Sequence, residues 1–296
     1  LNNLVTEKII YRRHGQGTFV SPRSRKGRIL VVAGRYGADS GLGEDFLNFL
    51  FGALDEANSA DLPCEPALVE LEDFFRNLDD VRMIYPETVG VLFFRGHENL
   101  LRAEKALEKQ ELPFLFYGPN LYGEKSKRYS TVHHNEASVA ALLAECYASR
   151  GFRRVLSLED GNDITRARVR LLTEALAGSG IACESRSWPE LSRQPEELRR
   201  LAGEFDVISA AVTQTAIEAV QILERDLRLR VPDTIAAAGI DNTPGSWQLR
   251  PQLTVVDLCN GENGRLCIRK FSELITAGSR PFHLDGKLAL IRRESC

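Results

Sequence analysis

Ile29-Leu30-Val31-Val32-Ala33 and Val89-Gly90-Val91-Leu92-Phe93-Phe94 are the runs of sequence that decide the fold. Each is short, continuous and apolar, which is typical of a strand buried on both faces of a parallel sheet. Similar runs lie at 67–71 and 114–117, and amphipathic stretches near 44–58, 72–82 and 98–109 separate the four. Strands that alternate with helices in this way predict repeated βαβ units.

A second set of alternating elements begins near Thr131. Apolar runs at 154–158, 183–188, 207–211 and 234–239 alternate with helical stretches near 136–149, 164–178, 194–203 and 214–228. Asn135 is placed to cap the first of these helices, and Gly151 follows its end. The predicted fold class is therefore α/β, with two doubly wound parallel-sheet lobes. Ligands of such folds bind beyond the carboxyl ends of the strands, which here means the cleft between the lobes.

The length of 296 residues and the hydrophobic content of 43% agree with two lobes in one chain. We predict a first lobe from about 28–129 and 259–284, and a second from about 133–256 and 285–296. The helix near 261–277 and the strand 288–291 are the segments that could return to the first lobe. The net charge of −3 opposes a nucleic-acid surface spread over the whole molecule, so any DNA contact is expected to be local.

Composition also limits the compartment and the chemistry. No apolar run approaches the roughly 20 residues needed to cross a bilayer, and no signal-peptide pattern opens the chain, so we expect a cytoplasmic protein without membrane contact. The six cysteines form no CxxC pair and no cluster with histidine, which predicts reduced core thiols rather than a metal site. No cofactor is implied, because the glycine-rich run 34–43 fits neither the dinucleotide nor the P-loop template.

Residues 1–22 differ in character from the rest of the chain. Helical spacing at the start is followed by two short strands, Ile9-Ile10-Tyr11-Arg12 and Thr18-Phe19-Val20, around the turn His14-Gly15-Gln16-Gly17. A partial helix and two strands cannot bury a core alone, and Leu1 reads as the middle of a helix, so we expect a truncated part of a longer protein. We interpret residues 23–27 as a polar linker before the domain 28–296.

Two resemblances follow from these motifs. The segment 4–20, with its Gly15-Gln16-Gly17-Thr18-Phe19-Val20 ending, closely resembles the end of the winged-helix domain of GntR-family regulators. The remaining residues resemble the effector domain of the LacI family, a combination known in one branch of GntR-type regulators. The matching segments are Gly151-Phe152-Arg153-Arg154-Val155, Arg168 ahead of Ala175-Leu176, Val231-Pro232-Asp233-Thr234-Ile235, Gly239-Ile240-Asp241-Asn242, Pro251-Gln252-Leu253-Thr254-Val255-Val256 and Ile291-Arg292-Arg293-Glu294-Ser295.

The resemblance implies a ligand-responsive, DNA-binding repressor that works as a homodimer. Arg12, Arg13, His14 and Gln16 of the wing would then contact operator DNA; the alternative is a solvated basic hairpin. Arg168 matches the LacI-family arginine that donates two hydrogen bonds to ligand hydroxyls; the alternative is a surface ion pair with Glu or Asp.

Asp241 matches a ligand-facing acid, and the alternative is a loop cap. The effector implied is a sugar or sugar derivative. Further ligand candidates come from their positions beside predicted strands: Arg35, Tyr36, Asp45 and Phe46 after the first strand, Arg95 after the third, and Trp247 in the loop after Asp241. Aromatic rings of this kind stack on sugars, although Phe46 fits the core equally well.

Three positions depart from the LacI pattern. Val212-Thr213 replaces a frequent Asn-Asp, Leu258 replaces a polar residue, and Gly118 replaces an acid. Hydrogen-bonding positions are thus lost, which puts an ordinary neutral hexose in doubt. Three arginines near the cleft leave an acidic or phosphorylated effector open, and a regulator with a degenerate pocket stays open as well.

Two other function classes are weighed against the regulator. A solute-binding protein of a transport system would show a signal peptide and no wing. An enzyme would need a convergent acid, base or nucleophile, and none is found: His133 and His134 are adjacent, hence on opposite faces of a strand, and no Ser-His-Asp order or HExxH pattern occurs. The sequence therefore predicts a regulator that is not an enzyme.

Overall fold

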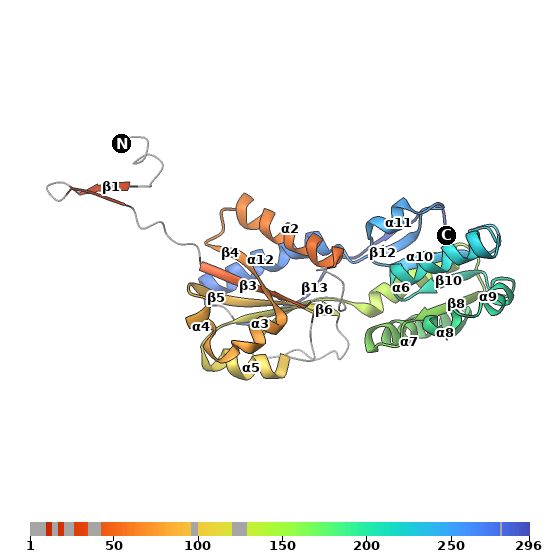
Figure 1. Ribbon diagram of the computed structural model, residues 1–296, viewed down its shortest axis with the longest axis horizontal. Helices are drawn as coiled ribbons and strands as arrows, with labels where there is room; N and C mark the ends of the chain where they lie inside the picture. The colour runs from red at the N-terminus through yellow and green to blue at the C-terminus, as the bar shows by residue number, and fades with distance from the viewer. Residues whose placement is uncertain are drawn as a thin grey trace.

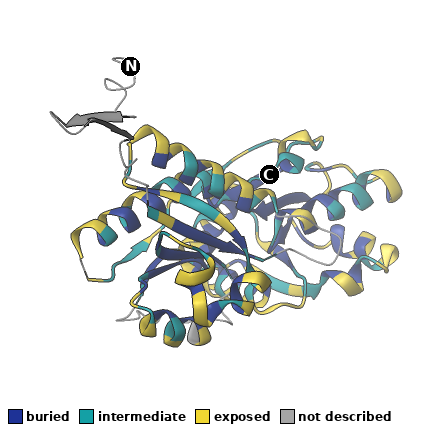
Figure 2. Ribbon diagram, turned by 60° about the vertical axis from the view of Figure 1, so that its left-hand side comes forward, coloured by how far each residue is buried: buried dark blue, intermediate teal, exposed yellow. Residues whose placement is uncertain are grey.

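The computed structural model describes residues 10–13, 17–20, 27–34, 43–95, 100–119, 129–278 and 280–296, with side chains described outside 10–20, 100 and 101. Two α/β lobes lie side by side along the long axis of the molecule (Figure 1). The central strands of both sheets are buried between helices whose outer faces are exposed (Figure 2). The predicted two-lobed fold class is confirmed.

The first lobe is built on a six-stranded sheet of order β13-β7-β6-β5-β3-β4, in which neighbouring strands pair parallel. Helices α2 and α12 cover one face, around Phe49 and Phe271, and α3, α4 and α5 cover the other, around Phe74 and Phe93. Its elements are β3 (Gly27–Ala33), α2 (Glu44–Ser59), β4 (Cys64–Glu70), α3 (Leu71–Arg76), η1 (Leu78–Asp80), α4 (Val81–Ile84), β5 (Thr88–Phe94), α5 (Leu100–Lys109), β6 (Phe114–Pro119), β7 (Ser130–His134), α12 (Asn260–Ala277) and β13 (His283–Asp285).

The second lobe has a six-stranded sheet of order β14-β12-β11-β10-β8-β9, parallel except for the antiparallel edge strand β14. Helices α6 and α7 cover one face, and α8, α9 and α10 cover the other. Its elements are α6 (Glu136–Ser149), β8 (Arg154–Glu159), α7 (Asp163–Ala177), β9 (Ala182–Ser187), α8 (Trp188–Leu191), α9 (Pro195–Ala202), β10 (Val207–Ala210), α10 (Thr213–Gln221), the π-helical η3 (Ile222–Asp226), β11 (Ala236–Ile240), α11 (Pro244–Gln248), β12 (Thr254–Asp257) and β14 (Ala289–Ile291).

Local sequence sets the helix ends as predicted. The Asn135 side chain accepts a hydrogen bond from the Ser138 amide at 3.1 Å and caps α6, and Gly151 takes φ +75° just beyond its end. Asn162 caps α7 in the same way, at 3.0 Å from the Thr165 amide. The first turn of each helix is thereby fixed at the end that faces the other lobe.

Helices α2 and α12 pack unusually closely because glycines lie at their contact. A Cβ atom on Gly52 would lie 2.7 Å from the carbonyl carbon of Gly261, and one on Gly264 would lie 3.0 Å from the carbonyl carbon of Phe49. At the same contact, Arg269 donates hydrogen bonds from Nε and Nη2 to the two carboxylate oxygens of the buried Glu56, at 2.7 and 2.9 Å. The two helices therefore present their first turns to the second lobe as one unit.

The N-terminal strands β1 (Ile10–Arg13) and β2 (Gly17–Val20) form the predicted antiparallel hairpin, which lies away from both lobes in Figure 1. One prediction of organisation needs correction. Ser130–His134 is the strand β7 of the first sheet, paired with β6, so the second lobe begins after it. The strand at 288–291 belongs to the second sheet, as the predicted second lobe of 133–256 and 285–296 has it, because Val255 pairs with Ile291; the alternative return to the first lobe does not occur.

Candidate functional site

The chain crosses between the lobes three times, after β7, after β12 and after β13. The parallel strands of both sheets end at these crossings, so Arg95, His134, Ala211 and Asp241, each within one residue of a strand's carboxyl end, are grouped at the lobe interface. This is the place where open α/β sheets bind ligands. The candidate site is therefore the cleft between the lobes.

A groove of about 650 Å³ lies between α2 and α12 on one side and the second lobe on the other. Phe51 is 64% exposed on the first-lobe wall, and Trp247, in α11, is 39% exposed on the opposite wall. The volume falls within the range of small-molecule sites, which are about 300 to 1,000 Å³. Its polar lining includes Asn48, Asp55, Asp241, Asn242, Asp257, Asn260, Glu262 and Arg265.

Asp241 lies at the second-lobe wall of this groove, just beyond β11. Its backbone has φ +87°, and its amide donates to the Val256 carbonyl at 2.8 Å. The carboxylate accepts a hydrogen bond from the Asn242 amide at 2.9 Å and from Asn260 Nδ2 at 3.3 and 3.4 Å. Burial raises the pKa of this carboxyl above its usual value, and Arg95 opposes the shift. The side chain thus combines a loop cap with a position facing the groove.

Behind the groove, a buried chain of hydrogen bonds runs through the first lobe. The Tyr117 hydroxyl donates to Asn260 Oδ1 at 2.8 Å, and His134 Nε2 lies 2.8 Å from the same hydroxyl. Because the hydroxyl has one proton, Nε2 of His134 is the donor to it. Burial lowers the pKa of His134 well below its ordinary value, so the ring is neutral. Among the described residues, its Nδ1 atom has no partner.

The first-lobe wall carries an ion pair. Arg95 Nη2 lies 2.7 Å from Asp45 Oδ2, and its guanidinium lies over the Phe94 ring at 5.2 Å from the centroid. Asp45 is in the first turn of α2, where a carboxylate is favoured by the helix dipole. Both side chains are at most 23% exposed. Two predicted ligand residues therefore contact each other.

Phe46 does not face the cleft. The ring is fully buried and packs edge-on against Phe94 at 5.0 Å between centroids. The prediction that it stacks on a ligand is wrong, because the helical turn that points Asp45 toward Arg95 points the next side chain into the core.

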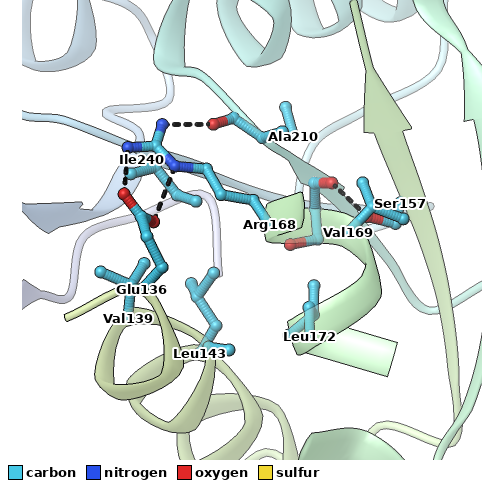
Figure 3. A pocket seen from close by; sticks show the side chains of 12 residues that line it. Glu136, Val139, Leu143, Ser157, Arg168, Val169, Leu172, Ala210 and Ile240 are labelled. Carbon is cyan, nitrogen blue, oxygen red and sulfur yellow. Dashed lines mark hydrogen bonds and ion pairs between the residues drawn. The ribbon is translucent and has the colours of Figure 1, made fainter. Parts of the chain in front are cut away.

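The second-lobe wall carries a second, more deeply buried ion pair (Figure 3). Arg168 donates from Nε and Nη2 to Glu136 at 2.9 and 3.0 Å, and from Nη1 to the Ala211 carbonyl at 2.9 Å. The two side chains are only 8% and 1% exposed. A cavity of about 10 Å³ beside them has room for about one water molecule. The predicted alternative for Arg168, an ion pair, is present, but it lies in the interior and not on the surface.

The three departures from the LacI pattern have structural explanations. The Thr213 hydroxyl donates to the Asp241 carbonyl, and Leu258 is fully buried in the second-lobe core. At Gly118 a Cβ atom would lie 2.8 Å from the Phe116 ring. These residues support the site's framework, and the two that replace ligand-facing side chains, Leu258 and Gly118, contribute no polar group to the cleft.

The remaining predicted residues divide into two groups. Arg12 and Arg13 lie on β1, with side chains not described, while His14, Gln16, Arg35 and Tyr36 lie outside the described residues. Sequence reasoning missed Glu136, Tyr117, His134 and Asn260. Only Asn260 and Glu136 carried a usable signal, as polar residues at the first turn of a helix after a lobe crossing.

Among the residues that the structure describes, no group of three or more His, Cys, Asp or Glu side chains is arranged to hold a metal ion. Among the described helices, none combines the length and apolarity of a membrane span.

The fold and cleft define a two-lobed clamp of the kind that binds small molecules. Residues 144–296 match the periplasmic binding protein-like domain, and the chain belongs to this family. No curated protein matches the sequence. The chain is similar in fold to the solved structure of a transcriptional regulator CelR–cellobiose complex, with 18% sequence identity and a TM-score of 0.73. The matched region covers 91% of this chain and 84% of the other.

Two further solved structures share the fold. The LacI family transcriptional regulator CCPA from Weissella paramesenteroides, with bound sucrose, has 16% identity and a TM-score of 0.73, with 90% of this chain and 98% of the other covered. A dimeric Lac repressor has 15% identity and a TM-score of 0.69, with 90% and 98% covered. At these identities the likeness establishes the fold.

Proposed function

We propose that this chain is the effector-sensing part of a ligand-responsive transcriptional regulator, and that its inter-lobe cleft binds a sugar or sugar derivative. The observation that carries the proposal is the groove lined by both lobes, with the Asp241 carboxylate and the exposed Trp247 ring on one wall. A carboxylate accepts hydrogen bonds from hydroxyl groups, and an indole stacks on the apolar face of a sugar ring. Solved structures with this fold include regulators with cellobiose and sucrose bound.

A ligand that contacts both walls would change the balance between open and closed clamps. It does so only by the difference in its affinity for the two states. In a homodimer such a change would alter the spacing of two DNA-binding domains. The hairpin of β1 and β2 is consistent with the wing of a GntR-type winged helix, in which Arg12, Arg13, His14 and Gln16 would contact DNA phosphates in the intact, cytoplasmic protein.

The experiment is a thermal-shift screen with cellobiose, sucrose, lactose, monosaccharides, sugar acids, sugar phosphates, polyols and purines. A ligand at 100 times its Kd stabilises the fold by about 2.7 kcal/mol, which raises the Tm by several degrees in a chain of this size. Asp241→Ala and Trp247→Ala should abolish the shift. Asp233→Ala, which removes an exposed carboxylate that is not part of the groove lining, should leave the shift intact.

A second candidate, a regulator whose pocket has lost its effector, is favoured by one observation: Arg168 already donates three of its five N–H groups to Glu136 and the Ala211 carbonyl. A panel in which no compound raises the Tm would support that candidate. The DNA part of the proposal is tested separately in the full-length regulator, where Arg12→Ala with Arg13→Ala should weaken binding to DNA and reduce its salt dependence by about two charges.

A further inference from the structure

Two of the three arginines predicted at the cleft are described by the structure, and each is matched by a carboxylate of the protein itself. Arg95 pairs with Asp45 on the first-lobe wall at 2.7 Å, and Arg168 pairs with Glu136 on the second-lobe wall at 2.9 and 3.0 Å. Arg95 and Arg168 lie close enough to Asp241 to oppose the rise in its pKa. The charges of these two described arginines are thus already neutralised.

Glu136 is fixed in place by the fold. It is the first residue of α6, directly after the Asn135 cap and the first crossing between the lobes. Its side chain is 1% exposed, and its two oxygens receive the Nε and Nη2 donors of Arg168 (Figure 3). A ligand carboxylate or phosphate that took this guanidinium would leave Glu136 buried without a cation, which is strongly unfavourable.

Arg168 nevertheless keeps a capacity to donate hydrogen bonds. A guanidinium has five N–H groups, and three of them are used by Glu136 and the Ala211 carbonyl. The other two suit a neutral acceptor such as a hydroxyl or ring oxygen. The ion pair therefore removes the net charge of the group while it leaves donors in a fixed orientation.

The groove lining also contains more acidic than basic side chains. It contains four acidic side chains, Asp55, Asp241, Asp257 and Glu262, and one basic side chain, Arg265. Asp55 pairs with Arg265, and Glu262 pairs with Lys287, which lies outside the lining. The other two lining carboxylates, Asp241 and Asp257, repel an anionic ligand and can accept hydrogen bonds from hydroxyl donors.

We infer that Glu136, together with Asp45, sets the specificity of the cleft by neutralising Arg168 and Arg95, so that it accepts an uncharged hydroxylated effector and rejects carboxylate and phosphate derivatives of it. The inference rests on the proposed sensing function and deepens it. It also decides between the two effector classes that the sequence left open, since the three cleft arginines had suggested an acidic ligand.

The test compares matched neutral and anionic ligands on the same protein. The probes are glucose with glucuronate and glucose 6-phosphate, and cellobiose with cellobionate, measured by thermal shift and calorimetry. The wild-type protein should bind the neutral member of a pair and show no shift with the anionic members. Glu136→Gln should raise affinity for the anionic member relative to the neutral one by at least about tenfold, since a charge-assisted hydrogen bond becomes available.

Two further variants complete the design. Glu197→Gln makes the same substitution in an exposed fork, where Glu197 pairs with Arg200 at 2.7 and 2.8 Å, and it should leave the preference unchanged. Asp45→Asn covers the case in which Glu136→Gln fails to fold, because it frees Arg95 on the opposite, more exposed wall, and it should shift the preference the same way.

The possible outcomes distinguish a failure of the inference from a failure of the proposed sensing function. A wild-type protein that prefers the anionic member overturns the inference and leaves the sensing function standing. Unchanged preference in a folded Glu136→Gln protein and in Asp45→Asn also overturns it. If no member of either series and no compound of the wider thermal-shift screen binds the wild-type protein, the sensing function fails, and the inference fails with it.

Discussion

Gly52→Ala is the substitution that best tests how the first lobe is held together. The new Cβ atom would lie 2.7 Å from the carbonyl carbon of Gly261, and closer still to its oxygen. Carbon atoms in contact are normally about 3.5 Å or more apart, so α2 and α12 would have to separate by about 1 Å. Neither atom can rotate away, because the Cβ is fixed to its own Cα and the Gly261 atoms belong to the backbone.

Overpacking of this kind costs about 1 to 3 kcal/mol, and we expect the upper end here because no side chain can yield. At about 2 to 4 °C per kcal/mol, the Tm should fall by about 6 to 12 °C. The matched control is Gly178→Ala at the end of α7, where φ is −63° and the nearest atom to a Cβ is 3.5 Å away. That variant should be unchanged or slightly more stable, by up to about 1 kcal/mol.

The assay is thermal unfolding followed by circular dichroism, with effector binding measured in parallel. Separation of the helices would also move Asn260, at the start of α12, away from Asp241, so ligand affinity should fall in Gly52→Ala. A Tm within 2 °C of the Gly178→Ala protein would refute the claim that backbone contact sets the spacing of these helices.

Three more predictions concern single side chains. Glu136→Gln should destabilise the fold by about 3 to 5 kcal/mol, because it leaves a buried guanidinium without its carboxylate. In urea unfolding, the control Glu197→Gln should leave the midpoint unchanged, and equal midpoints for the two variants would contradict the prediction. By the same assay, Phe46→Ala should lower the free energy of unfolding by about 3 to 5 kcal/mol and Phe51→Ala by less than about 0.5 kcal/mol, since only the Phe46 ring is buried. The reverse order would show Phe46 to be a surface residue. Burial lowers the pKa of His134, so the unfolded chain binds a proton that the folded one excludes, and stability should fall as pH drops below 6.5, by up to about 1.4 kcal/mol per pH unit. His134→Gln should flatten this part of the pH profile, and an unchanged slope would rule out His134 as its source.

The fold could be predicted largely from the sequence because its central strands are buried on both faces. Continuous apolar runs such as Val89–Phe94 have no other stable environment, and these strands appear where the runs are. The edge strand β13 could not be found, since His283–Asp285 has no apolar run and is identified by its pairing with Thr131–His133 alone. The helix expected at 72–82 is broken into α3, η1 and α4.

The site was less predictable, because its chemistry depends on contacts between distant parts of the chain. Arg168 and Glu136 are separated by 32 residues, and nothing local in the sequence indicates that they pair. Asp241, which the resemblance assigned to the cleft, lines the groove, and its contact with a ligand stays a prediction. The role of Phe46 was misjudged because one residue of helical rotation separates the cleft from the core. The ligand roles of Arg35 and Tyr36 stay predictions.

The hydrogen bonds of Asn260 indicate where an effector has most influence on the clamp. Asn260 is held firmly by the first lobe, through Tyr117 at 2.8 Å, and weakly by the second, through Asp241 at 3.3 and 3.4 Å. The contact between Asn260 and Asp241 is therefore the weaker of the two side-chain contacts of Asn260. A ligand hydroxyl that replaces it would bind both lobes at once, and such a contact differs between open and closed states, as a shift of their populations requires.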